Sequence, residues 1–305
     1  MTQTVLLAGA TGMLGSQIAR YLLSSPNTRL RLLVRKRGTA KDSAALAPFL
    51  DGGAEMVEGD LAQRDSLERA TQNVDVIVSA VQGGPEVIID GQVALAEAGK
   101  RNGVRRILPS DYALDLFKAT PGENATYDLR RTADERIAKL GLEQINVLQG
   151  AFMWVFLPGH GAVDLDAGAI SFFGDGNERI ETTSVEDTAR IIARVATDRS
   201  VKPGKFAIAG DRLSFREAGE IVSEITGRRL KPVSLGSEDA LRAAMRVADP
   251  EKRVMLAYQL YMLNGQTALT DLQNERYPDI RLERFADFAA HELTPKPESL
   301  HHPNR

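Results

Sequence analysis

A glycine-rich turn near the N-terminus constrains this chain more than any other feature. Its glycines are spaced Gly9-x-x-Gly12-x-x-Gly15, and they follow an apolar run, Val5 to Ala8, that is typical of a buried parallel strand. Glycine reaches the backbone conformations of so tight a turn at low cost. It also lets a pyrophosphate approach the main chain, where free N–H groups and the dipole of a following helix favour negative charge. The turn therefore predicts a phosphate site, although a structural turn in any α/β protein is the alternative.

Apolar runs alternate with helical stretches through the first half of the chain. Strands are predicted at 29–34, 53–61, 74–81, 104–112 and 143–148, and stretches with helical spacing lie between them. Alternation of this kind requires right-handed crossovers and a parallel sheet. We therefore expect an α/β protein of the Rossmann type, a doubly wound parallel sheet whose ligands lie off the carboxyl ends of the strands.

Shorter elements follow in the second half. A hairpin is predicted about the turn Gly174-Asp-Gly-Asn177, and helices are predicted at 238–247 and 251–263. We expect a smaller, discontinuous α+β substrate lobe to sit on the nucleotide domain. The predicted division is a nucleotide-binding domain at 1–157 with 183–209 returning to it, a smaller lobe at 158–182 and 210–293, and a flexible tail at 294–305.

The residues after the second predicted strand bear on the choice between NAD and NADP. Arg35, Lys36 and Arg37 stand about 20 residues after the last glycine, where an acidic residue would bind the ribose 2′-hydroxyl of NAD. No Asp or Glu follows until Asp42. Arginine instead attracts the 2′-phosphate of NADP through charge-assisted hydrogen bonds. We predict NADP(H), with Arg35 as the first contact and Lys36 or Arg37 as the second, and a solvated basic turn as the alternative for any one of them.

Composition excludes several other classes of function. The 305-residue chain has a formal net charge of −3, so neither nucleic acid nor an anionic membrane is expected as its main partner. It has no cysteine, which excludes disulfides and thiolate catalysis. No apolar run is long enough to span a bilayer, and no signal-peptide pattern is present, so we expect a cytoplasmic protein. No cluster has convincing metal-ligand spacing, and we expect no metal site.

Several separated motifs belong together. They are Gly9–Gly15, Leu33-Val-Arg35, Val57-Glu-Gly-Asp60-Leu61, Asp75–Val81, Arg106-Ile-Leu-Pro-Ser110-Asp-Tyr112, Phe173–Asn177 and Val185–Ala189. With these motifs the chain resembles the atypical short-chain dehydrogenase/reductases, and within them the NmrA-like and isoflavone-reductase-like group. The resemblance implies a Rossmann fold and a bound nicotinamide nucleotide. Cofactor contacts are expected from Gly9, Thr11, Gly12, Met13, Leu14, Gly15, Arg35, Lys36, Asp60, Leu61, Ala80, Val81, Gln82 and Ser110.

Two catalytic patterns that the resemblance suggests are each incomplete. Many short-chain dehydrogenases use a tyrosine with a lysine four residues later on the same helix face. Here Tyr127 is followed by Arg131, which supplies positive charge but cannot give up a proton. The isoflavone-reductase-like group resembles a design with a lysine shortly before an Arg-Arg pair. Arg130-Arg131 matches the pair, but the lysine position falls near Thr126. The nearest upstream lysine is Lys118, for which a solvated loop position is favoured over a place above the cofactor.

Tyr127, Arg131 and Asp111 are the predicted catalytic residues. Tyr127 and Arg131 can both face the cofactor from one helix, although both also have structural alternatives. Asp111 follows Ser110 directly, and it could be a buried acid or the cap of the next turn. Tyrosine catalysis is in doubt because the usual lysine is replaced by an arginine.

An apolar pocket wall is predicted just after the sixth strand. Residues 152–157 (FMWVFL) are strongly apolar, and core packing under the second lobe is the alternative. Tyr112, Phe152, Trp154 and His160 are the predicted pocket residues, with a polar loop position as the alternative for His160. The Met and Tyr residues of 238–263 could line a pocket, form a partner surface or belong to the core.

These predictions favour an NADPH-dependent reductase that transfers a hydride to a small apolar quinone, enone or aromatic ketone. The alternative is an NmrA-like sensor that binds NADP(H) without turnover and signals redox state to a protein partner. The missing lysine favours the sensor, whereas the apolar wall and the second lobe favour the enzyme. The sequence leaves the oligomeric state open.

Overall fold

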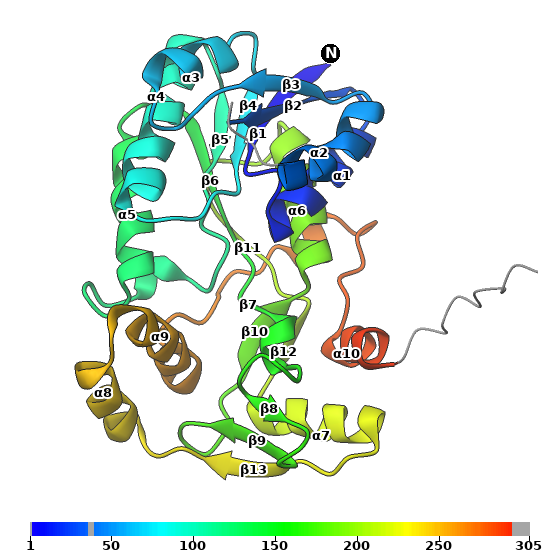
Figure 1. The fold of residues 1–305 in the computed structure, drawn as a ribbon, viewed down its shortest axis with the longest axis vertical. Coiled ribbons are helices and arrows are strands. Elements are labelled where there is room, and N and C mark those ends of the chain that lie inside the picture. The colour runs from blue at the N-terminus through cyan, green and yellow to red at the C-terminus, as the bar shows by residue number, and fades with distance from the viewer. Residues whose placement is uncertain (1, 36–39, 295–305) are drawn as a thin grey trace, which may run out of the picture.

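The computed structural model describes residues 2–35 and 40–294. A parallel sheet of seven strands forms the half of the molecule that contains the N-terminus (Figure 1), in the order β11-β6-β5-β4-β1-β2-β3. This arrangement confirms the predicted Rossmann-type fold, because the strand order reverses at β1 and leaves a crevice at that point. The strands are β1 (Gln3–Ala8), β2 (Thr28–Val34), β3 (Glu55–Glu58), β4 (Val76–Ser79), β5 (Arg106–Leu108), β6 (Glu143–Leu148) and β11 (Gly204–Ala207).

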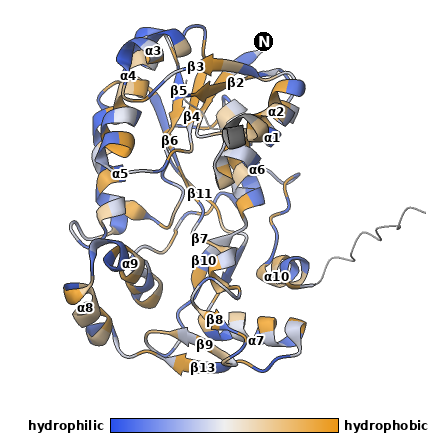
Figure 2. Cartoon of the chain, in the orientation of Figure 1, coloured by the Kyte–Doolittle hydropathy of each residue, from blue (hydrophilic) through white to orange (hydrophobic). Residues whose placement is uncertain are grey.

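Helices cover both faces of this sheet. One layer contains α1 (Met13–Ser24), α2 (Ala40–Asp51) and α6 (Val185–Thr197), and the other contains α3 (Arg64–Ala70), α4 (Gln92–Arg101) and α5 (Ala125–Ala138). Successive side chains of β1 alternate between the two layers, since Val5 and Leu7 pack in one core while Leu6 and Ala8 pack in the other. Strands that are buried on both faces are mostly apolar, as the colouring of the central strands in Figure 2 shows.

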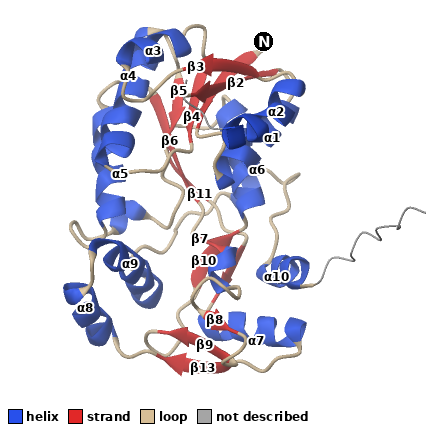
Figure 3. Cartoon of the chain, in the orientation of Figure 1, coloured by secondary structure: helices blue, strands red, loops and turns tan. Residues whose placement is uncertain are grey.

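Two small sheets, each of three strands, form the other half of the molecule, in the orders β12-β10-β7 and β13-β9-β8. Figure 3 shows them below the large sheet, flanked by separate helices. The strands are β7 (Ala151–Phe152), β8 (Val163–Asp164), β9 (Ala169–Phe172), β10 (Ile180–Thr183), β12 (Asp211–Leu213) and β13 (Lys231–Ser234). The helices are α7 (Phe215–Thr226), α8 (Glu238–Val247), α9 (Pro250–Asn264) and α10 (Phe285–Leu293).

Short helical turns complete the description. They are a π-helical segment, η1 (Glu86–Gly91), which leads into α4, and three 3-10 turns, η2 (Leu116–Lys118), η3 (Met153–Phe156) and η4 (Asn274–Arg276). Within the described residues, no helix combines the length and the apolar character needed to cross a membrane.

The predicted hairpin about 174–177 is wrong. β9 pairs with β8 and β13, whereas β10 pairs with β7 and β12, so the strands on either side of this turn diverge into different sheets. The turn itself is present, with positive φ at Gly174 and Gly176. Its flanking strands find partners that are distant in sequence, which local turn chemistry cannot specify.

One segment of the predicted smaller lobe packs on the large sheet. Tyr277 is only 4% exposed and belongs to the same apolar core as β1 and α6, with Ile280 and Leu282 beside it. Its ring stacks on Phe206 of β11 with 6.1 Å between centroids. Residues 273–282, here called the return segment, therefore connect the two halves by packing as well as by chain. The predicted flexible tail lies outside the described residues, apart from Thr294.

Candidate active site

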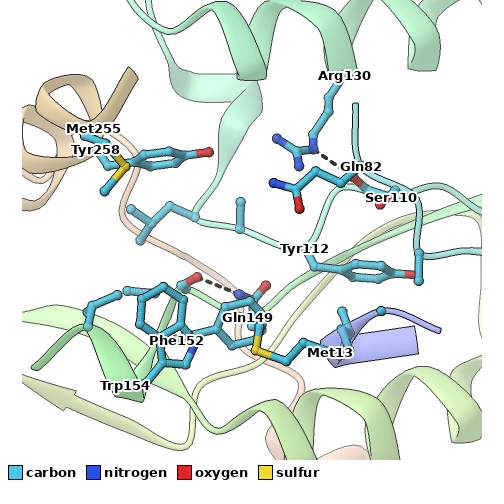
Figure 4. Close-up of a pocket in the computed structure, with 18 of the residues that line it drawn as sticks. Met13, Gln82, Ser110, Tyr112, Arg130, Gln149, Phe152, Trp154, Met255 and Tyr258 are labelled. Atoms are coloured by element: carbon cyan, nitrogen blue, oxygen red, sulfur yellow. Dashed lines mark hydrogen bonds between the residues drawn. The ribbon is translucent and has the colours of Figure 1, made fainter. Parts of the chain in front are cut away.

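A cavity of about 870 Å³ extends from the carboxyl ends of the central strands into the space between the two halves of the molecule. Parallel strands all end at the same edge of the sheet, so the loops that follow them converge there. The part at this edge is lined by the glycine turn and by the loops after β2, β3, β4 and β5. The remaining part is lined by the small sheets and by α9, and Figure 4 shows residues from both parts.

The three glycines of the turn have different surroundings. Gly9 has a φ of 89°, and a Cβ there would overlap the backbone carbonyl of Ala80. A Cβ on Gly15 would overlap the carbonyl of Gly9, because α1 begins directly against the turn. A Cβ on Gly12 would meet only the Gly9 oxygen, at an ordinary 3.4 Å. Gly9 and Gly15 are therefore required by packing, whereas Gly12 keeps open a space that faces the cavity.

The N-terminus of α1 is arranged to receive an anion. Its N-cap is Gly12, no side chain caps it, and its first turn contains no acidic residue. The backbone N–H groups at the start of a helix have no intrahelical partner, and the helix dipole adds partial positive charge there. The space above Gly12 can thus hold a phosphate group on main-chain donors, which is the contact that a dinucleotide requires.

Further groups line the cavity on either side of this turn. Arg35, at the end of β2, is exposed, and Asp60 and Leu61 lie after β3. On the other side, Ser110 joins two strand ends, because its Oγ donates to the carbonyl of Val81 at 2.8 Å. A nucleotide whose diphosphate lies at β1 can therefore extend its adenosine half toward Arg35 and its other half toward Ser110.

Most of the predicted cofactor contacts line this cavity. They are Gly9, Thr11, Gly12, Met13, Leu14, Arg35, Asp60, Leu61, Ala80, Val81, Gln82 and Ser110. Gly15 lies beneath the turn and does not line the cavity, and Lys36 falls outside the described residues.

Tyr127 is held inside a cluster of tyrosines. Its ring lines the cavity, but its hydroxyl oxygen is buried and has no hydrogen-bond partner among the described residues. The ring stacks on Tyr261 with centroids 5.6 Å apart and meets the edge of Tyr258 at 5.4 Å. Burial raises the pKa of Tyr127 well above its ordinary value. These surroundings make the hydroxyl a poor proton donor to a ligand in the cavity.

Arg131 does not face the cavity, which corrects the prediction that it shares a ligand-facing surface with Tyr127. Its guanidinium donates to the backbone carbonyl of Ala119 and pairs with Asp128 one helical turn earlier. Lys118 is also outside the cavity, and its Nζ donates to the carbonyl of Ala268 at 2.7 Å. Arg131 is thus held by the loop that contains Ala119, and Lys118, from the same loop, is held by the segment that follows α9.

Arg130, which is not among the predicted site residues, is the cation of α5 that reaches the cavity. Its Nε donates to the carbonyl of Ser110 at 2.7 Å, as Figure 4 shows. Its Nη1 is buried and has no hydrogen-bond partner among the described residues. The Arg-Arg pair in the sequence indicates a cation near the ligand. Which of the two arginines faces the cavity depends on how α5 is rotated about its axis.

Asp111 is fully buried and lies behind the cavity wall, which corrects its predicted position beside the ligand. It accepts a hydrogen bond from Nδ2 of Asn146 at 2.7 Å and faces Asp134 of α5. Burial raises the pKa of both carboxyl groups. The charge of Asp111 raises that of Asp134 further, to about 10, so the pair retains one proton at neutral pH. The remaining negative charge is close to Arg130, which lowers the pKa of both acids.

The four predicted pocket residues line the cavity. They are Tyr112, Phe152, Trp154 and His160. The hydroxyl of Tyr112 donates to the carbonyl of Ser79 at 2.9 Å, so it points away from the open space. The Trp154 ring lies 6.3 Å from Phe152 and 4.8 Å from His160, and the three rings form one aromatic wall.

The part of the cavity that is lined by the small sheets and by α9 is here called the chamber. Two polar groups in the chamber are not among the predicted site residues. Gln149 donates from Nε2 to the carbonyl of Gly150 at 2.9 Å, which leaves its buried Oε1 without a partner among the described residues. Tyr258 enters from α9. For the Met and Tyr residues of 238–263, the sequence allows a place in the pocket or in the core. The cavity is lined by Met255, Tyr258 and Met262, whereas the core contains Met245 and Tyr261. In the described part of the chain, no group of three or more His, Cys, Asp or Glu side chains could hold a metal ion.

Comparisons with known proteins agree with this architecture. The bifunctional pinoresinol-lariciresinol reductase of Linum usitatissimum is 25% identical over 313 residues, covering 93% of this chain and 97% of that protein. A phenylcoumaran benzylic ether reductase of Ginkgo biloba is 27% identical over 293 residues, covering 91% and 94%. A solved structure of AtPrR2 with NADP+ and (+)pinoresinol has a TM-score of 0.85 at 22% identity, covering 95% of this chain and 99% of that one. The model of the NmrA-like family matches residues 1–302, which confirms the resemblance, and the chain belongs to that family.

Proposed function

We propose that this protein is an NADPH-dependent reductase of a small aromatic or conjugated substrate. The observation that carries the proposal is the continuity of one cavity, which joins a dinucleotide-type glycine turn to an aromatic chamber. Hydride transfer requires a substrate carbon beside the nicotinamide in a space from which water is largely excluded. The strand ends and the aromatic wall together offer such a space.

The residues around the crevice fit the phosphates of NADP(H). The main-chain N–H groups after Gly12 would bind the diphosphate, and Arg35 would bind the 2′-phosphate. NADPH, when bound, supplies the hydride. Ser110, Gln82 and Arg130 line the cavity on the side of β4 and β5, where the nicotinamide half would extend.

The chamber and the relatives point to the same class of substrate. Phe152 and Trp154 supply aromatic faces, and Phe172, Phe215 and Met262 add apolar surface. The relatives are named as reductases of pinoresinol, lariciresinol and a phenylcoumaran ether, all at 25–27% identity. A quinone, an enone or an aromatic ketone of similar apolar character would fit this lining.

Binding and turnover can be measured separately. Trp154 is the only tryptophan of the chain and lines the cavity, so energy transfer from it to NADPH reports binding. Consumption of NADPH against 1,4-naphthoquinone, benzylideneacetone and acetophenone then tests the reaction. The proposal is wrong if the wild-type protein consumes no NADPH with any of these compounds, whether or not it binds NADPH.

Arg35→Gln should distinguish the two nicotinamide cofactors. Loss of a charge-assisted contact to the 2′-phosphate should weaken NADPH binding about tenfold or more and leave NADH binding unchanged. Arg29→Gln is the matched control, because Arg29 is exposed on the same strand but at its opposite end. Equal losses for NADPH and NADH would contradict the assignment of Arg35.

A sensor without turnover is the second candidate. It is favoured by the positions of Tyr127, whose hydroxyl is buried, and of Arg131 and Lys118, which lie outside the cavity. A sensor would bind NADPH tightly, consume none with the compounds above and retain a protein partner only when the cofactor is present. Turnover with any of the compounds would favour the reductase.

A further inference from the structure

The structure contains a tyrosine that faces the cavity with a free hydroxyl. Tyr258 lies on α9, and Figure 4 shows its hydroxyl directed into the space that the Arg130 guanidinium enters from α5. The hydroxyl has no hydrogen-bond partner among the described residues. A phenol in this position can donate a hydrogen bond, or a proton, to a ligand atom.

The other tyrosines that line the cavity do not offer a free hydroxyl. Tyr112 donates its proton to the carbonyl of Ser79 at 2.9 Å. The hydroxyl oxygen of Tyr127 is buried. The Ser110 hydroxyl is also occupied, since it donates to Val81. Tyr258 is therefore the tyrosine of this site whose acidic proton remains available.

Packing fixes the direction of the Tyr258 ring. Its edge meets Tyr127 at 5.4 Å with an interplanar angle of 82°, and Tyr127 is itself stacked on Tyr261. Tyr127 thus has a structural use, as the surface against which Tyr258 is oriented. Aromatic rings in edge-to-face contact are held more firmly than isolated side chains.

The end of α9 is tied to the loop that precedes α5. The backbone N–H of Asp115 donates to the carbonyl of Thr267 at 2.9 Å, and Nε2 of Gln266 donates to the carbonyl of Lys118 at 3.0 Å. In the other direction, Nζ of Lys118 donates to the carbonyl of Ala268 at 2.7 Å. These bonds hold α9 and α5 in a fixed relation, so Tyr258 and Arg130 keep their positions on two sides of one space.

Arg130 can provide the positive charge that a carbonyl reduction requires, because negative charge develops on the oxygen when a hydride adds to the carbon. Its Nη1 is buried and has no hydrogen-bond partner among the described residues, and the Arg130 side chain is part of the cavity lining. A guanidinium stays protonated throughout the physiological range, so it can stabilise negative charge but cannot supply the proton. A second group must therefore act as the acid, and Tyr258 is positioned for this role.

We infer that Tyr258 donates the proton to the substrate oxygen while Arg130 stabilises the negative charge that develops there. This inference rests on the proposed reductase function. The substrate carbonyl carbon gains a hydride from NADPH, the carbon–oxygen π bond breaks, and its electron pair moves to oxygen. The O–H bond of Tyr258 then breaks as the oxygen takes the proton, and a proton from solvent restores the tyrosine after the product has left. The carbonyl is reduced to an alcohol and NADPH is oxidised to NADP+.

Tyr258→Phe is the direct test in the turnover assay. Removal of a general acid should lower kcat for benzylideneacetone or acetophenone about 100-fold, with little change in KM or in NADPH binding reported by Trp154. Tyr261→Phe is the matched control, because Tyr261 lies on the same helix but does not line the cavity. The control should keep the wild-type kcat.

A second measurement needs neither cofactor nor turnover. The anion of 4-nitrophenol resembles the oxyanion that Arg130 and Tyr258 would stabilise, and its absorbance shows whether the bound probe is ionised. The wild-type protein should bind the anion, and Tyr258→Phe or Arg130→Gln should weaken that binding about tenfold. Thermal melts of each variant separate this effect from loss of folding.

The outcomes separate this inference from the proposed function. If the wild type consumes NADPH and Tyr258→Phe keeps its kcat within about threefold, the role of Tyr258 is wrong and the reductase stands. The same conclusion follows if Tyr127→Phe loses more activity than Tyr258→Phe. If the wild type consumes no NADPH, the reductase proposal fails. The pairing of Tyr258 with Arg130 is overturned as well if Tyr258→Phe and Arg130→Gln both bind the anion of 4-nitrophenol as tightly as the wild type does.

Discussion

Gly12 and Gly15 lie one helical turn apart, yet different physical constraints keep them as glycine. Gly15 faces the backbone of Gly9 with no room for a Cβ, whereas Gly12 faces the cavity and has room for one. The φ of Gly12 is −79°, which any residue can adopt. Packing of the protein therefore requires Gly15, and only a ligand would require Gly12.

The two glycines should respond differently to alanine. Gly12→Ala should fold normally and bind NADPH about tenfold more weakly, because the methyl group takes space needed by the diphosphate. Gly15→Ala should lower the free energy of unfolding by about 1–3 kcal/mol, because α1 must move away from the turn. Urea unfolding and energy transfer from Trp154 measure the two effects. Normal NADPH binding by Gly12→Ala would contradict the assigned phosphate position.

Arg130 and Arg131 show how far sequence reaches at the scale of a residue. The Arg-Arg pair is visible in the sequence, and the pattern favours Arg131 as the catalytic cation because Arg131 is four residues after Tyr127, as on a known helix face. In the structure the guanidinium of Arg131 bonds to Ala119 and Asp128, whereas the side chain of Arg130 faces the cavity. Spacing along a helix predicts which residues share a face, but not which face the surrounding elements cover.

At the scale of the element, α5 is organised by a buried acid pair as well as by its caps. Asn124 accepts hydrogen bonds from the N–H groups of Thr126 and Tyr127, which starts the helix. Nearer its end, Asp134 accepts a bond from Nε2 of Gln144 at 2.9 Å and faces Asp111 on the loop after β5. Two buried carboxyl groups remain together only if they share a proton.

Asp134→Asn should stabilise the protein increasingly as pH rises. Burial and Asp111 raise the pKa of Asp134 in the folded state to about 10, above its unfolded value. The folded state therefore keeps a proton that the unfolded state releases, so the wild type loses stability as pH rises above about 4. The amide of asparagine resembles the protonated acid and avoids this cost. The gain in free energy of unfolding should be on the order of 1–3 kcal/mol at about pH 8 and smaller at about pH 5.

Thermal melts across this pH range measure the difference. Glu135→Gln is the matched control, since Glu135 is the exposed neighbour of Asp134 on the same helix. The control should run parallel to the wild type at every pH. A loss of stability in Asp134→Asn that is equal at both ends of the range would show that the pair is not protonated as described.

At the scale of the whole molecule, the return segment couples the two halves. Tyr277 stacks on Phe206, and its hydroxyl donates to Asp198 at 3.0 Å, so a residue from late in the chain completes the core of the large sheet. The segment then leads into α10, which packs with the aromatic core of the other half through Phe285. A cavity bounded by both halves needs a coupling of this kind to keep its shape.

Tyr277→Ala should weaken this coupling. Loss of a buried aromatic ring from a packed core costs about 3–5 kcal/mol, so the urea midpoint should fall clearly. Far-ultraviolet circular dichroism follows the whole molecule, and Trp154 fluorescence reports the boundary between the halves. Leu272→Ala is a suitable control, because Leu272 is 44% exposed just before the segment. A midpoint unchanged from the wild type would mean that the return segment does not contribute to stability.

The nucleotide-binding half of this protein is predictable from local patterns in its sequence. The glycine turn, the alternation of strands and helices and the position of Arg35 are local patterns, and local patterns depend on backbone sterics and side-chain burial that act over a few residues. The parallel sheet and the convergence of loops at one edge follow from them, because parallel strands joined by crossovers all end at the same edge. Most of the predicted cofactor contacts accordingly line the cavity.

The groups that meet in the chamber are set by packing between segments that are distant in sequence. Tyr258 and Arg130 are 128 positions apart and approach from separate helices, whose rotation is set by packing against Tyr127, Tyr261 and the loop before α5. The partners of β9 and β10, and the burial of Asp111 against Asp134, also depend on surfaces from distant segments. Such contacts form because apolar surface is buried collectively, and no single stretch of sequence contains both sides of them.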